Sequence, residues 1–581
     1  DVERSRGLGD VYKRQILTPI IALISGLSMA LAPAPLNFWP LAWVSLAPLW
    51  VLIVELTTKL ENQNYSQYSN KNIWNFPIKL LEKLSFKFPI KLSVNFLILP
   101  VLWGIGYHGL ALSWIFGIYT TNWMGIYWLA SLAITCIFWI AISIWGSIFV
   151  TIWAIGIALF SQLISKIPKI PSLTSQLNTS LQRILIGTTL WCSLEFIWSN
   201  TPLWWSSLSY TQSPSNLVIL HLGQISGPAT VTAAIVTING LIAEAWLNLK
   251  HISKYNQNNI KNNSRVKIIF LILPIISFIV FHILGFLLYT RPLNEISANA
   301  LKIGIIQGNI PAKLKVKNNS VRTSLEIYAN GYRTLADRGV DAVLTPETAL
   351  PIIWSDNPSI YNNFYQAILE KNIVAWLGAF GTKNQNYTNS LFTITGDGKK
   401  FSQYEKVNLV PFGEYIPFAE ILQGIINKII PWNAGLVPGK INQIFTTPFG
   451  SAIVGICYDS AFAEHFRRQA ATGGEFIITA SNNSYYTAAM PPQHHALDLM
   501  RAIETDKWAV RVSNTGYSGF IDPHGKTIWI SQLNTYQLHA DTIYRRPTKT
   551  LYVLWGDRLT PVLFLSGIFI WWQMQKKLKN L

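Results

Sequence analysis

The sequence predicts a protein in two structural parts, a polytopic α-helical membrane domain of eight spans and an α/β domain outside the cytoplasm. Eight apolar runs are long enough to cross a bilayer, which takes about 20 residues. Only 13% of the residues are charged, against about 25% in a typical globular protein, and the mean hydropathy is +0.28. After Tyr289 the long apolar runs stop and short ones alternate with turn signals, which indicates an α/β domain.

The expected spans divide the chain into domains. Residues 1–15 have no apolar period, and their last part looks like the translation of a sequencing adapter, so we expect a non-native leader there; the alternative is a short genuine basic tail. The spans that follow are expected at 16–34, 37–56, 94–117, 126–164, 182–199, 228–247, 267–289 and 551–573. We therefore expect a seven-span membrane domain (16–289), an α/β domain (290–550), an eighth span (551–573) and a basic cytoplasmic tail (574–581).

Loop charge sets the direction of the spans. With a cytoplasmic N-terminus, 17 basic and two acidic residues lie on the cytoplasmic side. They are in the connections 57–93, 165–181 and 248–266, in the C-terminal tail and in the flanks of these segments. They account for +15 of the net charge of +18, and the connections on the opposite side have no charged residue. Splitting the long run at 126–164 into two spans would break this pattern. By the positive-inside rule the α/β domain lies outside the cytoplasm, and the excess charge needs no nucleic-acid partner.

A few polar residues stand out within the spans. Cys136 and Cys192 lie in apolar runs, where a cysteine is typically a small buried residue. Glu244 lies near the cytoplasmic end of its span, where we expect it to reach water. Glu195 lies nearer the outer end, and it either has a function or is paired internally. Aromatic residues at the outer ends fit an interfacial belt or the lining of a lipid entrance.

The α/β domain is predicted from short apolar runs and helical periodicity. Amphipathic helices are expected at 320–338 and 490–508, and hairpin turns at Gly396–Gly398 and Pro523–Gly525. Strands are expected at 301–307, 341–345, 373–380, 391–395, 451–456 and 475–480.

Polar residues follow three strand-like segments. Glu347 lies in AVLTPETALP, Lys406 and Glu414 lie in YEKVNLVPFGEYIP, and Cys457 lies in SAIVGICYDS. A thiol nucleophile needs a base for its proton and a cation or oriented amides for the oxyanion, and Glu, Lys and Cys can supply these roles. A nearby ammonium also lowers the pKa of a thiol from about 8.5 toward neutrality. Taken singly, each residue also has a purely structural interpretation, and spacing alone does not bring them together.

Six strings in a fixed order add a resemblance. The Glu, Lys and Cys motifs resemble the triad of the nitrilase, or carbon-nitrogen hydrolase, superfamily. Together with the spans, they resemble the apolipoprotein N-acyltransferase family over the chain after residue 15. This resemblance implies a nitrilase-like α-β-β-α sandwich for residues 290–550. The strings are IIQGNIP (305–311), PET (346–348), VPFGEYIP (410–417), GICYD (455–459), QHHALDLMRAIE (493–504) and RVSNTG (511–516).

The resemblance implies a ping-pong acyl transfer, the final step of lipoprotein maturation. Cys457 would attack the sn-1 ester of a membrane phospholipid such as phosphatidylethanolamine, giving a thioester and a lysophospholipid. The α-amine of the S-diacylglyceryl cysteine of an apolipoprotein would then take the acyl chain. Glu347 would be the general base and Lys406 the oxyanion stabiliser. The supporting positions that carry over are Glu414, Asn389, Tyr458, Glu504 and Arg511.

The expected setting is the bacterial inner membrane, with a monomeric enzyme whose catalytic domain lies in the periplasm. No cofactor is expected, because the acyl group arrives already activated as an ester. No metal site is expected either, since His494 and His495 are adjacent and lack the i, i+4 spacing of a ligand pair.

Several positions depart from the family pattern. Val316 replaces a usual Trp, Asn408 a common His and Asp459 a usual Glu, and residues 482–486 (NNSYY) replace an acidic-aromatic element. These changes leave the triad intact and bear on acceptor binding and the gating loop. The connection 57–93 is also longer than is typical.

Two other functions remain open from the sequence. A membrane-tethered nitrilase-type amidase would act on small amides without phospholipid. A lipid-binding scaffold or transporter with a degenerate nitrilase-like domain would have no activity, although the intact Glu347, Lys406 and Cys457 argue against it.

Overall fold

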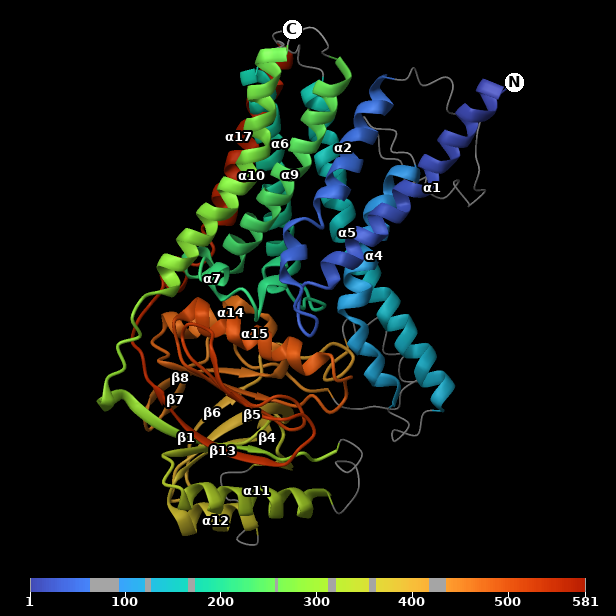
Figure 1. Ribbon diagram of the computed structural model, residues 1–581. Helices are drawn as coiled ribbons and strands as arrows, with labels where there is room; N and C mark the ends of the chain where they lie inside the picture. Colours follow the sequence, from blue (N-terminus) through green and yellow to red (C-terminus); the bar gives the residue numbers. More distant parts are fainter. Residues whose placement is uncertain are drawn as a thin grey trace.

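The chain folds into a bundle of long helices stacked on an α/β domain (Figure 1). The computed structural model describes residues 2–62, 94–120, 127–165, 173–255, 260–311, 320–354, 362–416 and 435–579. Val316 and most of the connection 57–93 lie outside the described residues.

The helical bundle contains most of the apolar runs. Four stretches of the described chain are long and apolar enough to cross a membrane, namely Trp39–Thr58, Trp128–Ser165, Pro228–Lys250 and Ile268–Tyr289, while Ile16–Ala30 and Phe96–Ala111 are apolar but shorter. The long helices are α1 (Val2–Ala30), α2 (Ala47–Asn62), α4 (Val94–Ala111), α5 (Trp128–Ser165), α6 (Leu173–Trp198), α9 (Pro228–Tyr255), α10 (Ile260–Tyr289) and α17 (Leu559–Lys579). The helix α1 thus continues back through the expected leader.

The long apolar run after residue 126 forms one helix, as the loop charges predict. Helix α5 has 38 residues, which at about 1.5 Å per residue is close to twice the roughly 30 Å thickness of a bilayer core. Its N-terminal half extends beside the α/β domain (Figure 1). There the ring of Phe138 contacts the ring of Phe412 in the α/β domain, with centroids 4.9 Å apart.

Two apolar runs are interrupted where composition shows no break. The run at 37–56 begins with a 3-10 turn, η1 (Trp39–Trp43), and α2 starts only at Ala47. The run at 551–573 begins with the short helix α16 (Leu551–Trp555) and continues in α17 from Leu559. Gly556 between them has a φ of 73°, a left-handed conformation that ends the first helix.

Tryptophan rings form much of the bundle core. Trp50, Trp103, Trp153 and Trp191 are buried and meet edge to face, with ring centroids 5.3–6.1 Å apart. Large rings in this geometry bury much apolar area and add specific contacts.

The bundle interior changes two expectations for its polar side chains. Glu244 does not reach water: it is 1% exposed, and its carboxylate pairs with Arg183 at 2.7 Å and accepts from Ser180 Oγ at 2.9 Å. The positive charge of Arg183 therefore balances the negative charge of the buried carboxylate inside the bundle. Cys192 is buried as expected, whereas Cys136 is only half-buried.

The α/β domain contains two sheets. The first has the order β13-β1-β2-β4-β5-β6 with β3 beside β4, and the second has the order β12-β11-β10-β9-β8-β7. The predicted hairpins join β5 to β6 and β11 to β12. The strands are β1 (Ala300–Gln307), β2 (Ala342–Leu344), β3 (Leu350–Ile353), β4 (Val374–Lys383), β5 (Asn386–Ile394), β6 (Lys400–Glu405), β7 (Phe445–Thr447), β8 (Gly450–Ile456), β9 (Phe476–Ser481), β10 (Ala509–Ser513), β11 (Gly519–Ile521), β12 (Thr527–Ile530) and β13 (Gln537–Tyr544).

The two sheets pack face to face between two helical layers. Side chains from both sheets, such as Trp376 and Ile478, share one core. Helices α11 (Ser320–Asp337) and α12 (Asn363–Lys371) cover the first sheet, and α14 (Ala463–Ala471) and α15 (Met490–Thr505) cover the second. This is the predicted α-β-β-α sandwich.

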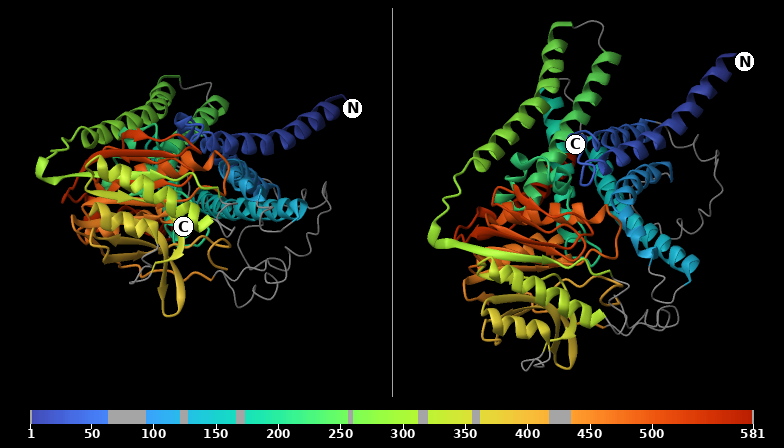
Figure 2. Two further views of the ribbon diagram at one scale, coloured as in Figure 1. Left: turned by 90° about the horizontal axis from the view of Figure 1, so that it is seen from below. Right: turned by 60° about the horizontal axis from the view of Figure 1, so that its bottom comes forward.

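The layer of α14 and α15 joins the sandwich to the bundle, and the views in Figure 2 show the two parts in contact. Ser213 Oγ donates to the Ala496 carbonyl at 2.7 Å, and Gln224 Nε2 donates to the Ile503 carbonyl at 3.2 Å. Trp204 Nε1 donates to Ala461 at 3.2 Å. The second sheet therefore presents its covering helices to the bundle.

Candidate active site

Glu347, Lys406 and Cys457 each follow the end of a strand. Glu347 comes three residues after β2, Lys406 directly follows β6, and Cys457 directly follows β8. The strands β2 and β6 run in the same direction within the first sheet, while β8 belongs to the second. The three residues are at most 6% exposed, so the site is enclosed between the ends of the two sheets.

Two carboxylates surround the ammonium group of Lys406. Its Nζ lies 2.9 Å from Glu347 Oε1 and 2.8 Å from Glu414 Oε2. Asn389 Nδ2 bridges the carboxylates, donating to Glu347 Oε1 at 2.7 Å and to Glu414 Oε1 at 2.9 Å. Burial acts to lower the pKa of Lys406, but the two carboxylates raise it well above its usual value. The lysine is thus a fixed cation in the site.

The nucleophile candidate has an unusual backbone conformation. Cys457 has a φ of 51°, in the left-handed region, and it begins the 3-10 turn η8 (Cys457–Ala461) immediately after β8. Non-glycine residues seldom adopt this conformation, and it concentrates at functional sites. His494 Nε2 donates to the Cys457 carbonyl at 2.9 Å, and the Asn482 N–H donates to the thiol.

The thiol is protonated at rest, which differs from the sequence-based expectation. Burial raises the pKa of Cys457 well above its usual value, and Glu347 adds to this effect. The Lys406 ammonium and the Asn482 N–H act in the opposite direction but are outweighed. Because the thiolate is not preformed, this thiol needs a neighbouring base when it reacts.

Tyr458 connects the nucleophile turn to the helical bundle. Its hydroxyl donates to the Pro202 carbonyl at 2.8 Å and also contacts the Trp204 carbonyl. Its ring stacks with Trp205 at a centroid distance of 6.4 Å and an interplanar angle of 9°. A residue adjacent to Cys457 is therefore held by the segment between α6 and α9.

Arg511 supports the nucleophile turn through a buried chain of contacts. It pairs with Asp498, and its Nη2 donates to Asn483 Oδ1 at 3.4 Å. Asn483 Nδ2 in turn donates to His494 Nδ1 at 3.1 Å. Burial, followed by the positive charge of Arg511, lowers the pKa of His494 to about 3. His494 is therefore neutral, and its Nε2–H is available to the Cys457 carbonyl.

Glu504 does not contact the triad. It accepts from Arg501 at 2.8 Å, and Arg501 Nη1 donates to the Ser460 carbonyl in the turn of Cys457 at 3.3 Å. Burial raises the pKa of Glu504 to about 7. This residue acts on the site through the turn, as Arg511 does.

Two of the departures from the family pattern contact each other. Asp459 Oδ1 accepts from the backbone N–H and from Nδ2 of Asn408, both at 2.8 Å. Asp459 Oδ2 accepts from the Ile456 N–H at 3.1 Å and from the Tyr404 hydroxyl at 3.3 Å. The pair joins the nucleophile turn to the segment that follows Lys406.

Three residues near the nucleophile were not predicted to have this role. From the sequence, Asn482 and Asn483 are departures from the family pattern, and His494 is a poor metal ligand. The signal for His494 is its position inside the string 493–504, and the signal for Asn482 and Asn483 is that they directly follow β9, as Cys457 follows β8. Tyr485 also lies near the site: burial raises its pKa to about 12, with smaller effects from Glu347 and Glu414. Among the described residues, no three His, Cys, Asp or Glu side chains are grouped as a metal site would require.

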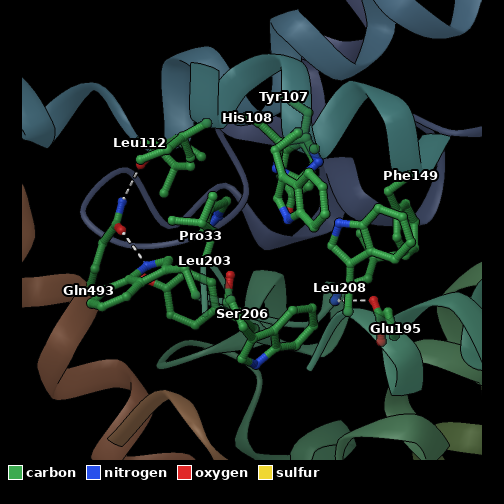
Figure 3. Close-up of a pocket in the computed structure, with 18 of the residues that line it drawn as sticks. Pro33, Tyr107, His108, Leu112, Phe149, Glu195, Leu203, Ser206, Leu208 and Gln493 are labelled. Carbon is green, nitrogen blue, oxygen red and sulfur yellow. Dashed lines mark hydrogen bonds between the residues drawn. The ribbon is translucent and has the colours of Figure 1, made fainter. Parts of the chain in front are cut away.

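A cavity lies between the helical bundle and α15 (Figure 3). It is bounded by α4, α5, α6, the segment 203–210 and Gln493 of α15, and no triad residue lines it. Gln493 Nε2 donates to the Ala111 carbonyl at 2.9 Å, and its Oε1 accepts from Trp205 Nε1 at 3.1 Å. Trp205 lines the cavity and stacks on Tyr458, and Trp204 lines it and donates to the Ala461 carbonyl of the nucleophile turn, so the cavity lies next to that turn.

Glu195 lies at the edge of this cavity and is paired internally. Its Oε1 accepts from the Leu208 N–H at 2.6 Å and from Trp191 Nε1 at 3.0 Å, and its Oε2 accepts from Thr232 Oγ1 at 2.8 Å. The carboxylate therefore holds the segment around Leu208 against α6 and α9.

Comparisons with known proteins identify the family. A model of the apolipoprotein N-acyltransferase N-terminal domain matches residues 87–241, and a carbon-nitrogen hydrolase model matches residues 232–544. The chain is 48% identical to an apolipoprotein N-acyltransferase of Nostoc sp. over 548 residues, which are 94% of this chain and 97% of the relative. The chain belongs to the apolipoprotein N-acyltransferase family.

The match extends across both parts of the molecule. An apolipoprotein N-acyltransferase of Synechocystis sp. is 39% identical over 94% of this chain and 98% of the relative. A nitrilase-superfamily protein of Saccharomyces cerevisiae is 19% identical, with a TM-score of 0.34, over 42% of this chain and 90% of that one. The resemblance carried by the six sequence strings is confirmed at the level of the family.

Proposed function

We propose that the chain transfers an acyl chain from a membrane phospholipid to the N-terminal α-amine of the S-diacylglyceryl cysteine of apolipoproteins. The observation that carries this proposal is the buried group of Glu347, Lys406 and Cys457 beside a helical bundle rich in apolar helices. Full-length similarity to enzymes named for this activity supports it.

The first half-reaction forms a thioester. Glu347 takes the thiol proton as Cys457 Sγ attacks the sn-1 ester carbonyl, and the Lys406 ammonium stabilises the oxyanion of the tetrahedral intermediate. The intermediate collapses with cleavage of the ester C–O bond. The lysophospholipid leaves as an alcohol after receiving the proton from Glu347. The raised pKa of the resting thiol supports a base that acts during the attack.

The second half-reaction transfers the acyl chain to nitrogen. The acceptor α-amine attacks the thioester carbonyl, and Glu347 removes a proton from the nitrogen. The C–S bond breaks, the amide forms, and the proton returns to Cys457. Glu414 and Asn389 position Lys406 and Glu347, while Tyr458, Glu504 and Arg511 hold the nucleophile turn.

The proposed topology has eight spans with both ends in the cytoplasm of a bacterial inner membrane. The α/β domain then lies in the periplasm, where a phosphatidylethanolamine-like donor and the lipoprotein acceptor are both membrane-anchored. The uncharged connection 200–227, which contacts Tyr458, supports this orientation.

Intact-protein mass spectrometry tests the proposal. The full chain in lipid nanodiscs containing phosphatidylethanolamine is expected to gain one acyl mass, which is released by an S-diacylglyceryl-cysteinyl peptide. Cys457→Ala is expected to abolish the gain, and Cys136→Ala in the bundle is the matched control. An acyl adduct of undiminished yield in Cys457→Ala would refute the assignment of Cys457 as the nucleophile. Turnover of small amides without formation of lysophospholipid would favour an amidase.

A further inference from the structure

The cavity beside Trp205 contains hydrogen-bond donors that have no partner. Trp145, Trp198 and Tyr210 all line it, and Trp145 Nε1, Trp198 Nε1 and the Tyr210 hydroxyl are buried without a hydrogen bond to any described residue. The rings of Trp145 and Trp198 are neighbours, with centroids 5.1 Å apart. Buried polar groups are nearly always paired, so several unpaired donors at one cavity indicate a missing acceptor.

Several other buried tryptophans of the bundle have partners. Trp43 Nε1 donates to Gln212 Oε1 at 3.0 Å, Trp103 Nε1 to the Ser45 carbonyl at 3.0 Å, and Trp153 Nε1 to the Gly187 carbonyl at 2.9 Å. Trp114 Nε1 has no partner among the described residues, and its ring contacts that of Trp205, with centroids 5.0 Å apart. In the described part of the bundle, unpaired buried indoles thus line the cavity or contact a ring that lines it.

The lining restricts the chemistry of an occupant. No Lys or Arg is among the described residues that line the cavity, which disfavours a phosphate group there. Aromatic and aliphatic side chains make up most of the wall, which suits an alkyl chain. The cavity volume is about 60 Å³. A water molecule needs roughly 10–15 Å³ by such a measure, so there is room for part of one chain but not for a whole glycerolipid.

We propose that this cavity binds an ester-linked acyl chain of a glycerolipid, whose ester carbonyl accepts a hydrogen bond from Trp145 or Trp198. The proposal rests on the proposed function, in which both substrates carry such chains. The chain belongs either to the donor phospholipid, as the acyl chain that is not transferred, or to the diacylglyceryl group of the acceptor. Because Trp204 and Trp205 both line the cavity and contact the nucleophile turn, a chain held there places the rest of the lipid next to that turn.

Photo-crosslinking separates the two sources. The first probe is phosphatidylethanolamine with a diazirine on its sn-2 chain, and the second is an S-diacylglyceryl-cysteinyl peptide with a diazirine on one acyl chain. Each is added to the full chain in nanodiscs, and the labelled peptides are mapped by mass spectrometry. We expect one of the two probes to label the α5 and α6 peptides that contain Trp145 and Trp198. That probe identifies the lipid from which the bound acyl chain comes.

A kinetic arm tests the unpaired donors. The double variant Trp145→Phe, Trp198→Phe keeps two rings and removes both N–H groups. We expect the KM for the substrate whose probe labels the cavity to rise about fivefold for each hydrogen bond lost, with kcat nearly unchanged. Trp571→Phe replaces a half-exposed tryptophan of α17 and is the matched control.

The outcomes separate this inference from the proposed function. If Cys457 is acylated but neither probe labels the cavity, or if the double variant keeps the wild-type KM for both substrates, the cavity is not a lipid site. The acyltransferase proposal then stands. If the wild-type protein forms no acyl-enzyme with any phospholipid, the acyltransferase proposal fails, and the lipid assignment of the cavity fails with it.

Discussion

Replacing Asn389 by Leu tests whether its amide holds the two carboxylates of the site in place. The change removes the hydrogen bonds from Nδ2 to Glu347 and Glu414 while leaving Lys406 between them. A hydrogen bond to a charged group is worth about 1.5–3 kcal/mol. If that energy is lost in the transition state, each 1.36 kcal/mol lowers the rate about tenfold. The rate of acylation is therefore expected to fall by about ten- to a hundredfold.

The assay is single-turnover formation of the acyl-enzyme, followed by intact mass at one fixed pH. Asn386→Leu is the matched control, because Asn386 lies on the same strand but is exposed. Its rate of acylation is expected to stay at the wild-type value. An unchanged rate in Asn389→Leu would show that the amide does not support the two carboxylates, and it would refute this reasoning.

Three further predictions follow from buried contacts of the site. The pKa of His494 is about 3, so its neutral form adds stability that is complete above pH 6.5 and declines as the pH falls toward 3. His494→Gln should thus lose less thermal stability than wild type between pH 7 and pH 4, a difference of about 3 kcal/mol, measured from Tm. Asp459→Asn replaces one carboxylate oxygen by an NH₂ group, which cannot accept from the N–H groups of Asn408 and Ile456, and should lower the unfolding free energy by about 2 kcal/mol. An unchanged denaturation midpoint would argue against a stabilising role for these hydrogen bonds. Gly117→Ala places a Cβ 2.4 Å from the Thr487 backbone nitrogen and should slow acylation roughly tenfold. Gly435→Ala, whose Cβ meets no described atom within 4 Å, should not slow it.

The fold could be predicted where strands are apolar and helices are periodic. All six expected strands are present, but β5 begins five residues before the expected start because its first half carries polar residues, including Asn389. The strands without a predicted counterpart are β3, β6, β7, β10, β11, β12 and β13. Strand β12 lies at a sheet edge and alternates half-buried and exposed residues, whereas β10 is fully buried but carries Arg511 and Ser513 among its apolar residues. In the bundle, apolar composition did not reveal the breaks before α2 and α17, which depend on backbone conformation.

The sequence by itself determined which residues are proposed to carry the chemistry and in what order they occur. Glu347, Lys406 and Cys457 could be named from motifs, and the single helix α5 followed from loop charge. Only the tertiary structure decided how these groups affect one another. Burial raises the pKa of the Cys457 thiol and the Lys406 ammonium lowers it, and burial has the larger effect because packing removes water from the thiol. The Asp459–Asn408 contact and the unpaired donors of the cavity likewise arise between segments far apart in the chain, where packing sets distance and solvent access.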